Sequence, residues 1–212
     1  MSTLGLEPSS NAVVLFDGTD LSAWTTRDGG EPAWDVADGI VTVAGGGDIV
    51  SKETYGDAYL HLEFRCPDMP EATGQAKGNS GVYLQGRYEI QVLDSYGWDV
   101  PGTGDCGAVY DLHAPIQPAC KPAMEWQTYD IVFRPARCDD AGDVIEKAGV
   151  TVVHNGLVVQ NNVTIQPTGG AMGAGETEPG PLLLQDHGDK VSYRNVWLVH
   201  LPEKGSDEYA PA

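Results

Sequence analysis

The feature of this sequence that most constrains its fold is the shortness and the period of its apolar runs. Apolar residues alternate with polar ones over a few positions at a time, and Gly and Pro interrupt the chain throughout. A period of two is typical of a half-buried β-strand, whereas an amphipathic helix repeats its apolar residues every three or four positions. The pattern predicts strands at residues 12–16, 40–43, 59–65, 81–84, 88–93, 128–134, 149–154, 157–160, 182–185 and 192–201.

Short strands separated by turn residues favour an all-β antiparallel sandwich. Because 212 residues still suit one such domain, we predict a single domain over residues 1–212, with its core at about 13–201 and a flexible polar tail at 202–212. Asn155-Gly156 can take the positive φ angles of a type I′ turn, which predicts a tight hairpin. Gly- and Pro-rich stretches predict long loops, which often line binding sites, at residues 71–79, 95–125 and 167–179.

The charge of the chain disfavours two classes of partner. There are 31 acidic and 12 basic side chains, a net charge of −19, and this excess repels nucleic acid phosphates and anionic lipid headgroups. No apolar run approaches the roughly 20 residues that cross a bilayer. The first residues lack the basic and apolar regions of a signal peptide, so the compartment stays open, and a secreted or periplasmic location is favoured only if a leader has been removed.

The cysteines show none of the Cys-x-x-Cys or Cys/His spacings of a structural zinc site. Cys66, Cys106, Cys120 and Cys138 allow either buried free thiols or disulfides whose pairing the sequence does not choose. Cys106 and Cys120 flank one Gly- and Pro-rich segment, which a disulfide between them could staple.

Two predicted strands carry paired polar side chains on the face opposite their apolar residues. On one strand these are Glu63 and Arg65, and on another they are Glu89 and Gln91, with Asp94 just beyond. Such a set can hydrogen-bond sugar hydroxyls and supply an acid or a base. The alternative is an ordinary hydrated face, because antiparallel sheets commonly expose one side to water.

Two further strands add candidate residues. Tyr83 follows Gly81, where the missing side chain would let a ligand approach the backbone. Another apolar run leads directly into Gln185 and His187, and a histidine at a strand end suits proton transfer near neutral pH. The alternative is a surface histidine at a turn. We interpret His154, at the predicted hairpin, as an exposed structural residue.

Ten motifs then follow one another between residues 13 and about 201. They are Leu15-Phe-Asp-Gly-Thr-Asp-Leu-Ser-Ala-Trp24, Trp34-x-Val-x-x-Gly39, Glu63-Phe-Arg65, Asn79-Ser-Gly81, Tyr88-Glu-Ile-Gln-Val-Leu-Asp94, Gly107-Ala-Val-Tyr110, Glu125-Trp-Gln-Thr-Tyr129, His154-Asn-Gly156, Leu184-Gln-Asp-His-Gly188 and Tyr193-Arg-Asn-Val196. In this order they resemble the 3-keto-disaccharide hydrolase domain family, and the order is far more specific than any one motif.

The resemblance implies a concanavalin A-like fold, a jelly roll of two curved antiparallel sheets, and action on glycosides whose sugar ring is oxidised at C3. A ketone at C3 acidifies the C2 proton, so that a base can remove it and the enolate can expel the C1 substituent, after which water can add. The implied activity is that of a 3-keto-glycoside hydrolase or lyase. The alternative is a noncatalytic, lectin-like carbohydrate-binding module, because fold does not fix function.

The residues predicted for this chemistry fall into two groups. For proton transfer they are His187, Glu89 and Asp94. For stabilising charge and binding the sugar they are Glu63, Arg65, Asn79, Tyr83, Gln91, Tyr110, Lys121 and Gln185.

The motif Glu89-x-Gln91-x-x-Asp94 also resembles the paired-acid strand of laminarinase-type glucanases. Gln91 stands where the central acid would be, which disfavours ordinary two-carboxylate hydrolysis. A divalent cation is a candidate cofactor for holding the enolate, but no metal-ligand spacing is legible, so the metal is left open.

Overall fold

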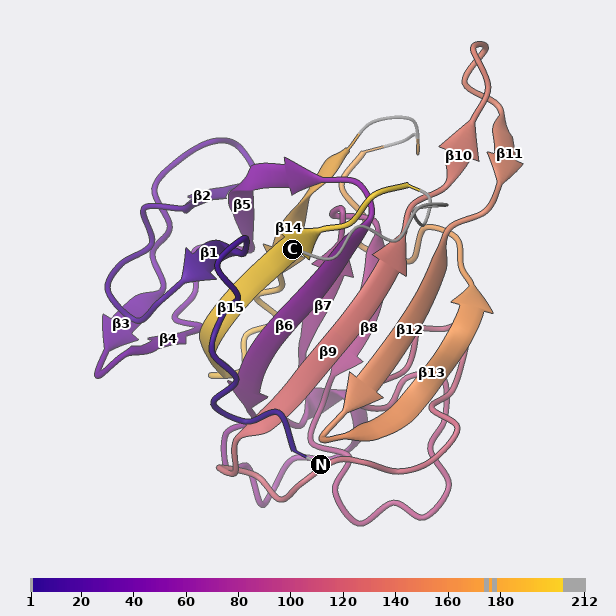
Figure 1. Ribbon diagram of the computed structural model, residues 1–212. Helices are drawn as coiled ribbons and strands as arrows, with labels where there is room; N and C mark the ends of the chain where they lie inside the picture. Colours follow the sequence, from indigo (N-terminus) through magenta and orange to yellow (C-terminus); the bar gives the residue numbers. More distant parts are fainter. Residues whose placement is uncertain (1, 174–175, 177–178, 204–212) are drawn as a thin grey trace.

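The computed structural model describes residues 2–173, 176 and 179–203, and two antiparallel sheets pack face to face in it (Figure 1). The larger sheet has eight strands, and the last long strand in the sequence lies in its middle. In spatial order its strands are β13 (Leu157–Thr164), β12 (Gly149–His154), β9 (Gln127–Arg134), β6 (Ala58–Arg65), β15 (Ser192–His200), β4 (Ile40–Thr42) and β3 (Asp35–Ala37), with β1 (Val13–Phe16) beside β15.

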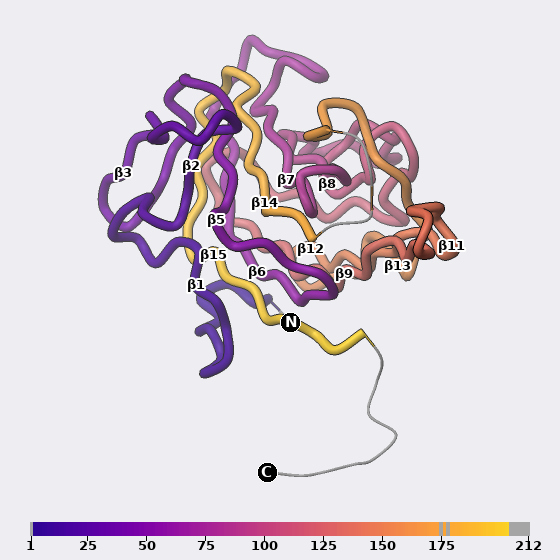
Figure 2. Tube along the Cα trace, turned by 90° about the horizontal axis from the view of Figure 1, so that it is seen from above, coloured from indigo at the N-terminus to yellow at the C-terminus, as the bar shows by residue number. Residues whose placement is uncertain are grey.

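The smaller sheet has five strands and forms the second layer, which Figure 2 shows from above. In spatial order they are β2 (Trp24–Thr26), β5 (Ile49–Tyr55), β14 (Gly180–Leu184), β7 (Ser80–Leu84) and β8 (Tyr88–Val92). A separate hairpin of β10 (Arg137–Cys138) and β11 (Val144–Glu146) and a short 3₁₀ turn, η1 (Gly74–Ala76), complete the described elements.

The core lies between the two sheets because each strand turns every second residue inward. Leu62 and Phe133 of the larger sheet and Val82 and Tyr88 of the smaller one are at most 1% exposed and belong to one apolar cluster. The rings of Tyr88 and Phe133 lie 5.5 Å apart between the layers. Burying each such side chain contributes roughly 1.5–3 kcal/mol. The structure thus confirms the predicted all-β, concanavalin A-like sandwich, a jelly roll of two curved antiparallel sheets.

Each strand expected from the apolar pattern is present, with ends shifted by a few residues. The expected hairpin joins β12 to β13, where Asn155 and Gly156 have φ angles of 52° and 82°. The prediction missed β2, β3, β5, β10 and β11. The sequence of β5 hides its role because Lys52 and Glu53 interrupt the apolar positions, yet this strand pairs with both β2 and β14.

The cysteines are free thiols. Cys106 and Cys120, which the sequence named as a possible staple, form no disulfide: Cys106 Sγ lies 3.2 Å from the Tyr129 hydroxyl, and Cys120 Sγ donates to Leu93 O at 3.6 Å. Burial raises the pKa of Cys106 well above its usual value, and the hydrogen bond from Cys106 lowers the pKa of Cys120.

The interpretation of His154 as an exposed residue is wrong. Its side chain is fully buried between the sheets, with Nε2 2.9 Å from Gln127 Oε1. Burial lowers the pKa of His154 to about 3, so the imidazole is neutral and structural.

Two predictions concern the ends and the environment of the chain. The predicted tail at 202–212 lies outside the described residues beyond Glu203 and stays a prediction. Among the described residues, no helix has the length and apolar character to span a membrane.

Candidate active site

A small cavity opens on the outer face of the five-stranded sheet, where the polar residues of β7 and β8 point away from the core. Its volume is about 150 Å³. It is lined by Gln75, Asn79, Tyr83, Glu89, Gln91, Tyr110, Gly169, Gly170, Gln185 and His187. We call it the Glu89 pocket. It brings together seven of the predicted residues, since Asn79, Tyr83, Glu89, Gln91, Tyr110, Gln185 and His187 all line it.

Glu89 lies at the buried side of this pocket and is 3% exposed. Its Oε2 accepts a hydrogen bond of 2.8 Å from the hydroxyl of Tyr83, directly across the β7–β8 pair. Burial raises the pKa of Glu89 to about 7; the Tyr83 hydrogen bond opposes this rise and the charge of Asp48 adds to it. Glu89 can therefore both accept and release a proton near neutral pH.

Gly81 makes room for this carboxylate. A Cβ atom at that position would lie 2.5 Å from Glu89 Oε1 and 2.9 Å from the ring of Tyr83, both closer than real contacts allow. Gly170 has the same role on the other side, because a Cβ there would lie 2.7 Å from the Tyr83 hydroxyl. Gly81, which the sequence suggested as a place for a ligand to approach, thus makes room for the side chain of Glu89 from the neighbouring strand.

A chain of amides orients Gln91. The Nε2 of Gln75 donates to Gly104 O at 2.8 Å, which directs Gln75 Oε1 toward Gln91 Nε2 at 3.0 Å and Asn79 Nδ2 at 3.2 Å. Gln91 Oε1 is then left buried without a hydrogen-bond partner among the described residues. An unpaired buried oxygen costs about 1–3 kcal/mol, so a ligand hydroxyl that donates to it would be stabilised.

Gln185 offers a second oxygen of the same kind. Its Nε2 lies 3.2 Å from the Tyr83 hydroxyl, and its Oε1 is buried with no partner in the described part of the chain. His187 follows two residues later and is exposed at the rim, while Tyr110 reaches the rim from the long loop after β8. The pocket therefore combines a titratable carboxyl, two free acceptors and an exposed imidazole.

Some residues around this pocket come from loops and were not predicted from the sequence. Gln75, in η1, lines the pocket itself. Arg27, which follows β2, lies behind the lining: its Nη2 donates to Gly170 O at 2.6 Å while its Nε pairs with Asp48 at 2.8 Å. These residues come from irregular segments, where no period marks the inward positions. The predicted loops at 71–79 and 167–179 do contribute Gln75, Gly169 and Gly170 to the lining, but loop length and composition do not single out the residues that face inward.

Four predicted residues lie outside the pocket. Asp94 is buried and pairs with Lys77 Nζ at 3.0 Å. Lys121 Nζ donates to Trp126 O at 2.8 Å, and Arg65 lies over the indole ring of Trp126. Glu63, the fourth, lies on the outer face of the larger sheet. The expectation that one polar face unites Glu63 and Arg65 with Glu89 is wrong, because β6 and β8 belong to opposite sheets.

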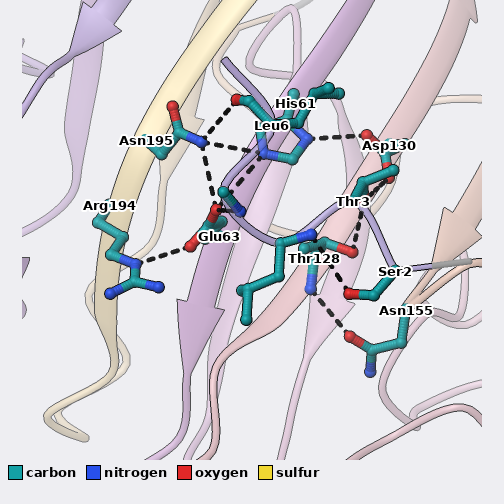
Figure 3. Close-up of polar contacts among 12 residues, drawn as sticks. Ser2, Thr3, Leu6, His61, Glu63, Thr128, Asp130, Asn155, Arg194 and Asn195 are labelled. Atoms are coloured by element: carbon teal, nitrogen blue, oxygen red, sulfur yellow. Dashed lines mark hydrogen bonds and ion pairs between the residues drawn. The ribbon is translucent and has the colours of Figure 1, made fainter.

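Glu63 belongs instead to a buried charged cluster, drawn in Figure 3. Its Oε2 accepts from Arg194 Nε at 2.7 Å, while His61 Nδ1 lies 2.8 Å from Asp130 Oδ1. Burial opposes ionisation of Glu63, but contacts with His61, Gly5, Arg194 and Asn195 outweigh it and lower its pKa to about 2. Burial likewise would lower the pKa of His61, and its bonds to Asp130 and Glu63 raise it instead.

The N-terminal segment 2–8 crosses this cluster as a strap (Figure 3). Thr3 Oγ1 donates to Asp130 and the Gly5 amide donates to Glu63 at 2.6 Å. Asn195 Nδ2 holds Leu6 O at 3.0 Å. The charged cluster thus binds a segment of its own chain, which explains its polar residues without a ligand.

No group of three His, Cys, Asp or Glu side chains suited to a metal ion occurs among the described residues. The divalent cation considered from the sequence stays a prediction.

Comparison with solved structures reveals relatives of the same fold. A candidate glycosyl hydrolase from Parabacteroides distasonis ATCC 8503 is 38% identical, with a TM-score of 0.83 over 91% of this chain and 84% of that one. A second candidate glycosyl hydrolase from that organism is 23% identical, with a TM-score of 0.65 over 91% and 94% of the two chains. The alginate lyase Aly36B, 12% identical with a TM-score of 0.51 over 92% and 99%, shares the fold alone.

A comparison with curated proteins finds no match. The sequence profile of the 3-keto-alpha-glucoside-1,2-lyase-like domain matches residues 11–199, which is most of the chain. The motifs, the sandwich and the glycosyl hydrolase relatives agree with this match, and the chain belongs to that family.

Proposed function

We propose that the chain cleaves 3-keto-glycosides, with Glu89 as the base that removes the C2 proton. The observation that carries the proposal is a buried carboxyl with a pKa of about 7 inside a pocket whose buried amide oxygens need donors. A carboxylate of ordinary pKa would be a weaker base toward a carbon acid, while one that titrates near 7 combines basicity with ionisation at neutral pH.

The reaction balances without an oxidant. The C2–H bonding pair becomes the enolate, whose collapse forms the C1–C2 double bond and breaks the bond from C1 to the departing oxygen. That oxygen takes a proton, for which His187 at the rim is the donor we assign. The products are an unsaturated 3-keto sugar, to which water can add, and the free aglycone.

The pocket supports a small, neutral ligand rich in hydroxyl groups. Its volume of about 150 Å³ is below the roughly 300–1,000 Å³ of pockets for drug-sized ligands, which suits one sugar ring. The oxygens of Gln91 and Gln185 can accept hydrogen bonds from ring hydroxyls. Tyr83 and Gln75 hold these groups in place before the ligand arrives.

The experiment compares 3-keto-glucosides with their unoxidised parents and measures the released aglycone. We expect release from the keto compounds alone, and a loss of about 10²–10⁴-fold in kcat for Glu89→Gln. Glu53→Gln is the matched control, because Glu53 is half exposed and remote in the sequence from the pocket residues. Equal activity of Glu89→Gln and wild type would exclude Glu89 as the base.

Two further readouts separate elimination from other mechanisms. Substrate deuterated at C2 should react more slowly if the C2–H bond breaks in the rate-limiting step, whereas direct displacement at C1 leaves that bond intact. A base must be ionised to act, so kcat/KM should rise with pH through about 7. Activity that falls through this range would assign Glu89 to the acid role.

The same assays test the cofactor and the alternative function. Activity that survives a chelator would exclude a divalent cation as a required cofactor of the reaction. Saturable glycan binding without aglycone release from any compound would instead make the chain a lectin-like module.

A further inference from the structure

No described carboxylate neutralises the guanidinium of Arg65, in contrast to Arg27, Arg134, Arg137 and Arg194 of this acidic chain. Its guanidinium lies over the indole of Trp126, with Cζ 4.9 Å from the ring centroid. Other basic side chains pair with carboxylates, namely Arg27, Lys77, Arg134, Arg137 and Arg194. With 31 acidic side chains available, Arg65 is still without a described acidic partner.

Arg65 lines a second cavity together with another such cation, Lys190. This cavity, which we call the Arg65 cavity, has a volume of about 180 Å³. Lys190 is exposed, and no ion pair joins it to a described acidic group. Arg65 ends β6, whereas Lys190 lies in the connection between β14 and β15. Two positive charges from separate elements face one hollow, and an anion between them would remove their mutual repulsion.

The indole of Trp126 holds Arg65 without cancelling its charge. A cation–π contact restrains the guanidinium and leaves its N–H groups free to donate. A planar guanidinium with free donors matches carboxylate and phosphate oxygens in a bidentate way. Arg194 lies over the same indole, with Cζ 4.1 Å from the ring centroid, but its charge is paired with Glu63. Lys121 Nζ donates to the backbone carbonyl of Trp126.

The connection 185–191 contributes one lining residue to this cavity and one to the Glu89 pocket. His187 lines the pocket and Lys190 lines the cavity, three residues later, so their Cα atoms are at most about 11 Å apart. Asn79 also lines the pocket, and its amide donates to Asp189 at 2.8 Å, which fixes the residue before Lys190. The two hollows share no lining residue and belong to different sheets, because Arg65 ends β6 of the larger sheet and Glu89 lies in β8 of the smaller one.

We propose that the Arg65 cavity is an anion-binding site, which takes the carboxylate or phosphate group of a small ligand and is separate from the Glu89 pocket. The site is independent of the proposed reaction, because binding there needs neither Glu89 nor turnover. It would give an otherwise strongly acidic surface one place where an anionic group of a sugar or aglycone is held.

The test is a two-dimensional NMR titration of the full chain with inorganic phosphate, followed by D-glucuronate and D-glucose. We expect a saturable shift of the Arg65 Nε–H signal with phosphate, weakened by added sodium chloride because the contact is partly exposed. Lys190→Gln should weaken binding by about tenfold, and Arg65→Gln should abolish it. Lys190 is exposed, so its variant keeps the test valid if Arg65→Gln fails to fold.

Lys147→Gln is the matched control. Lys147 lines a different cavity, and Lys147→Gln changes the net charge by the same amount as Lys190→Gln does. Retained binding in Lys147→Gln, with loss in Lys190→Gln, supports a built site. The proposal is overturned if phosphate gives no saturable shift at Arg65, if Lys147→Gln loses binding equally, or if glucose shifts Arg65 as strongly as glucuronate does.

Discussion

At the scale of single residues, the Glu89 pocket depends on a carboxyl group that is buried away from water. Glu89 is buried beside Tyr83 and Asp48, and the same burial that brings its pKa to about 7 makes its ionised form costly. A pKa raised above the value of the unfolded chain favours the protonated folded protein. The stability that this contributes is complete below pH 4.5 and is lost as the pH rises through about 7.

Glu89→Gln should therefore gain stability relative to wild type as the pH rises. The rise in pKa from 4.5 to about 7 corresponds to ~3 kcal/mol. Urea unfolding at pH 4 and pH 8 should show the difference between variant and wild type growing by about that amount. A difference that is equal at both pH values would mean that Glu89 titrates normally.

Gly81→Ala should disturb the pocket although it adds one methyl group. The new Cβ would lie 2.5 Å from Glu89 Oε1, so the carboxylate and Tyr83 must move. We expect a loss of about 1–3 kcal/mol in unfolding free energy together with reduced kcat on 3-keto-glucosides. Gly56→Ala is the control, because a Cβ there meets nothing within 4 Å; equal effects of both substitutions would remove the role assigned to Gly81.

These residues also show what the sequence could predict. Glu89 and Gln91 were found because a strand places alternate residues on one face. Gln75, which lines the pocket, and Arg27, which holds Gly170 of its lining, were missed because they lie outside the strands, where side-chain directions follow no period. Glu63 was placed in the wrong group, since a period of two tells which residues share a face but not to which sheet that face belongs.

At the scale of elements, the strap 2–8 and strands β6, β9 and β15 form one unit around buried charges. His61 and Arg194 balance Asp130 and Glu63, which leaves no net charge among these four groups when His61 is protonated. Buried ions are stable only while each keeps its partner. The strap is therefore held by Glu63, Asp130 and Asn195, which belong to β6, β9 and β15.

His61→Gln should destabilise the protein by about 3 kcal/mol at neutral pH, because it leaves the carboxylates of Asp130 and Glu63 short of one positive charge. Hydrogen exchange at the Gly5 amide should become faster, since Glu63 holds that amide. His113→Gln is the control, because the His113 imidazole lies 2.9 Å from the carbonyl of Thr164 at the end of β13 and has no hydrogen bond to the charged cluster among the described residues. An unchanged Gly5 amide in His61→Gln would separate the strap from the charged cluster.

At the scale of the whole molecule, the outer faces of the two sheets carry different features. The outer face of the smaller sheet carries the Glu89 pocket, while the outer face of the larger one binds the strap. Apolar periodicity predicted the sandwich well because the core between the sheets follows it. It missed β5, whose Lys52 and Glu53 break the pattern, since that strand is held by backbone bonds to β2 and β14.

The place of β15 has a consequence for how the chain is made. This strand comes late in the sequence, yet β1, β4 and β6 all pair with it. During synthesis β1, β4 and β6 therefore leave the ribosome before β15, with which they pair, has been made. The pairing of β1 with β15 joins residues from nearly opposite ends of the chain. Such distant pairing slows folding and leaves apolar strand edges open to aggregation meanwhile. A nascent chain that stalls before residue 192 would thus present chaperones with an unfinished sheet.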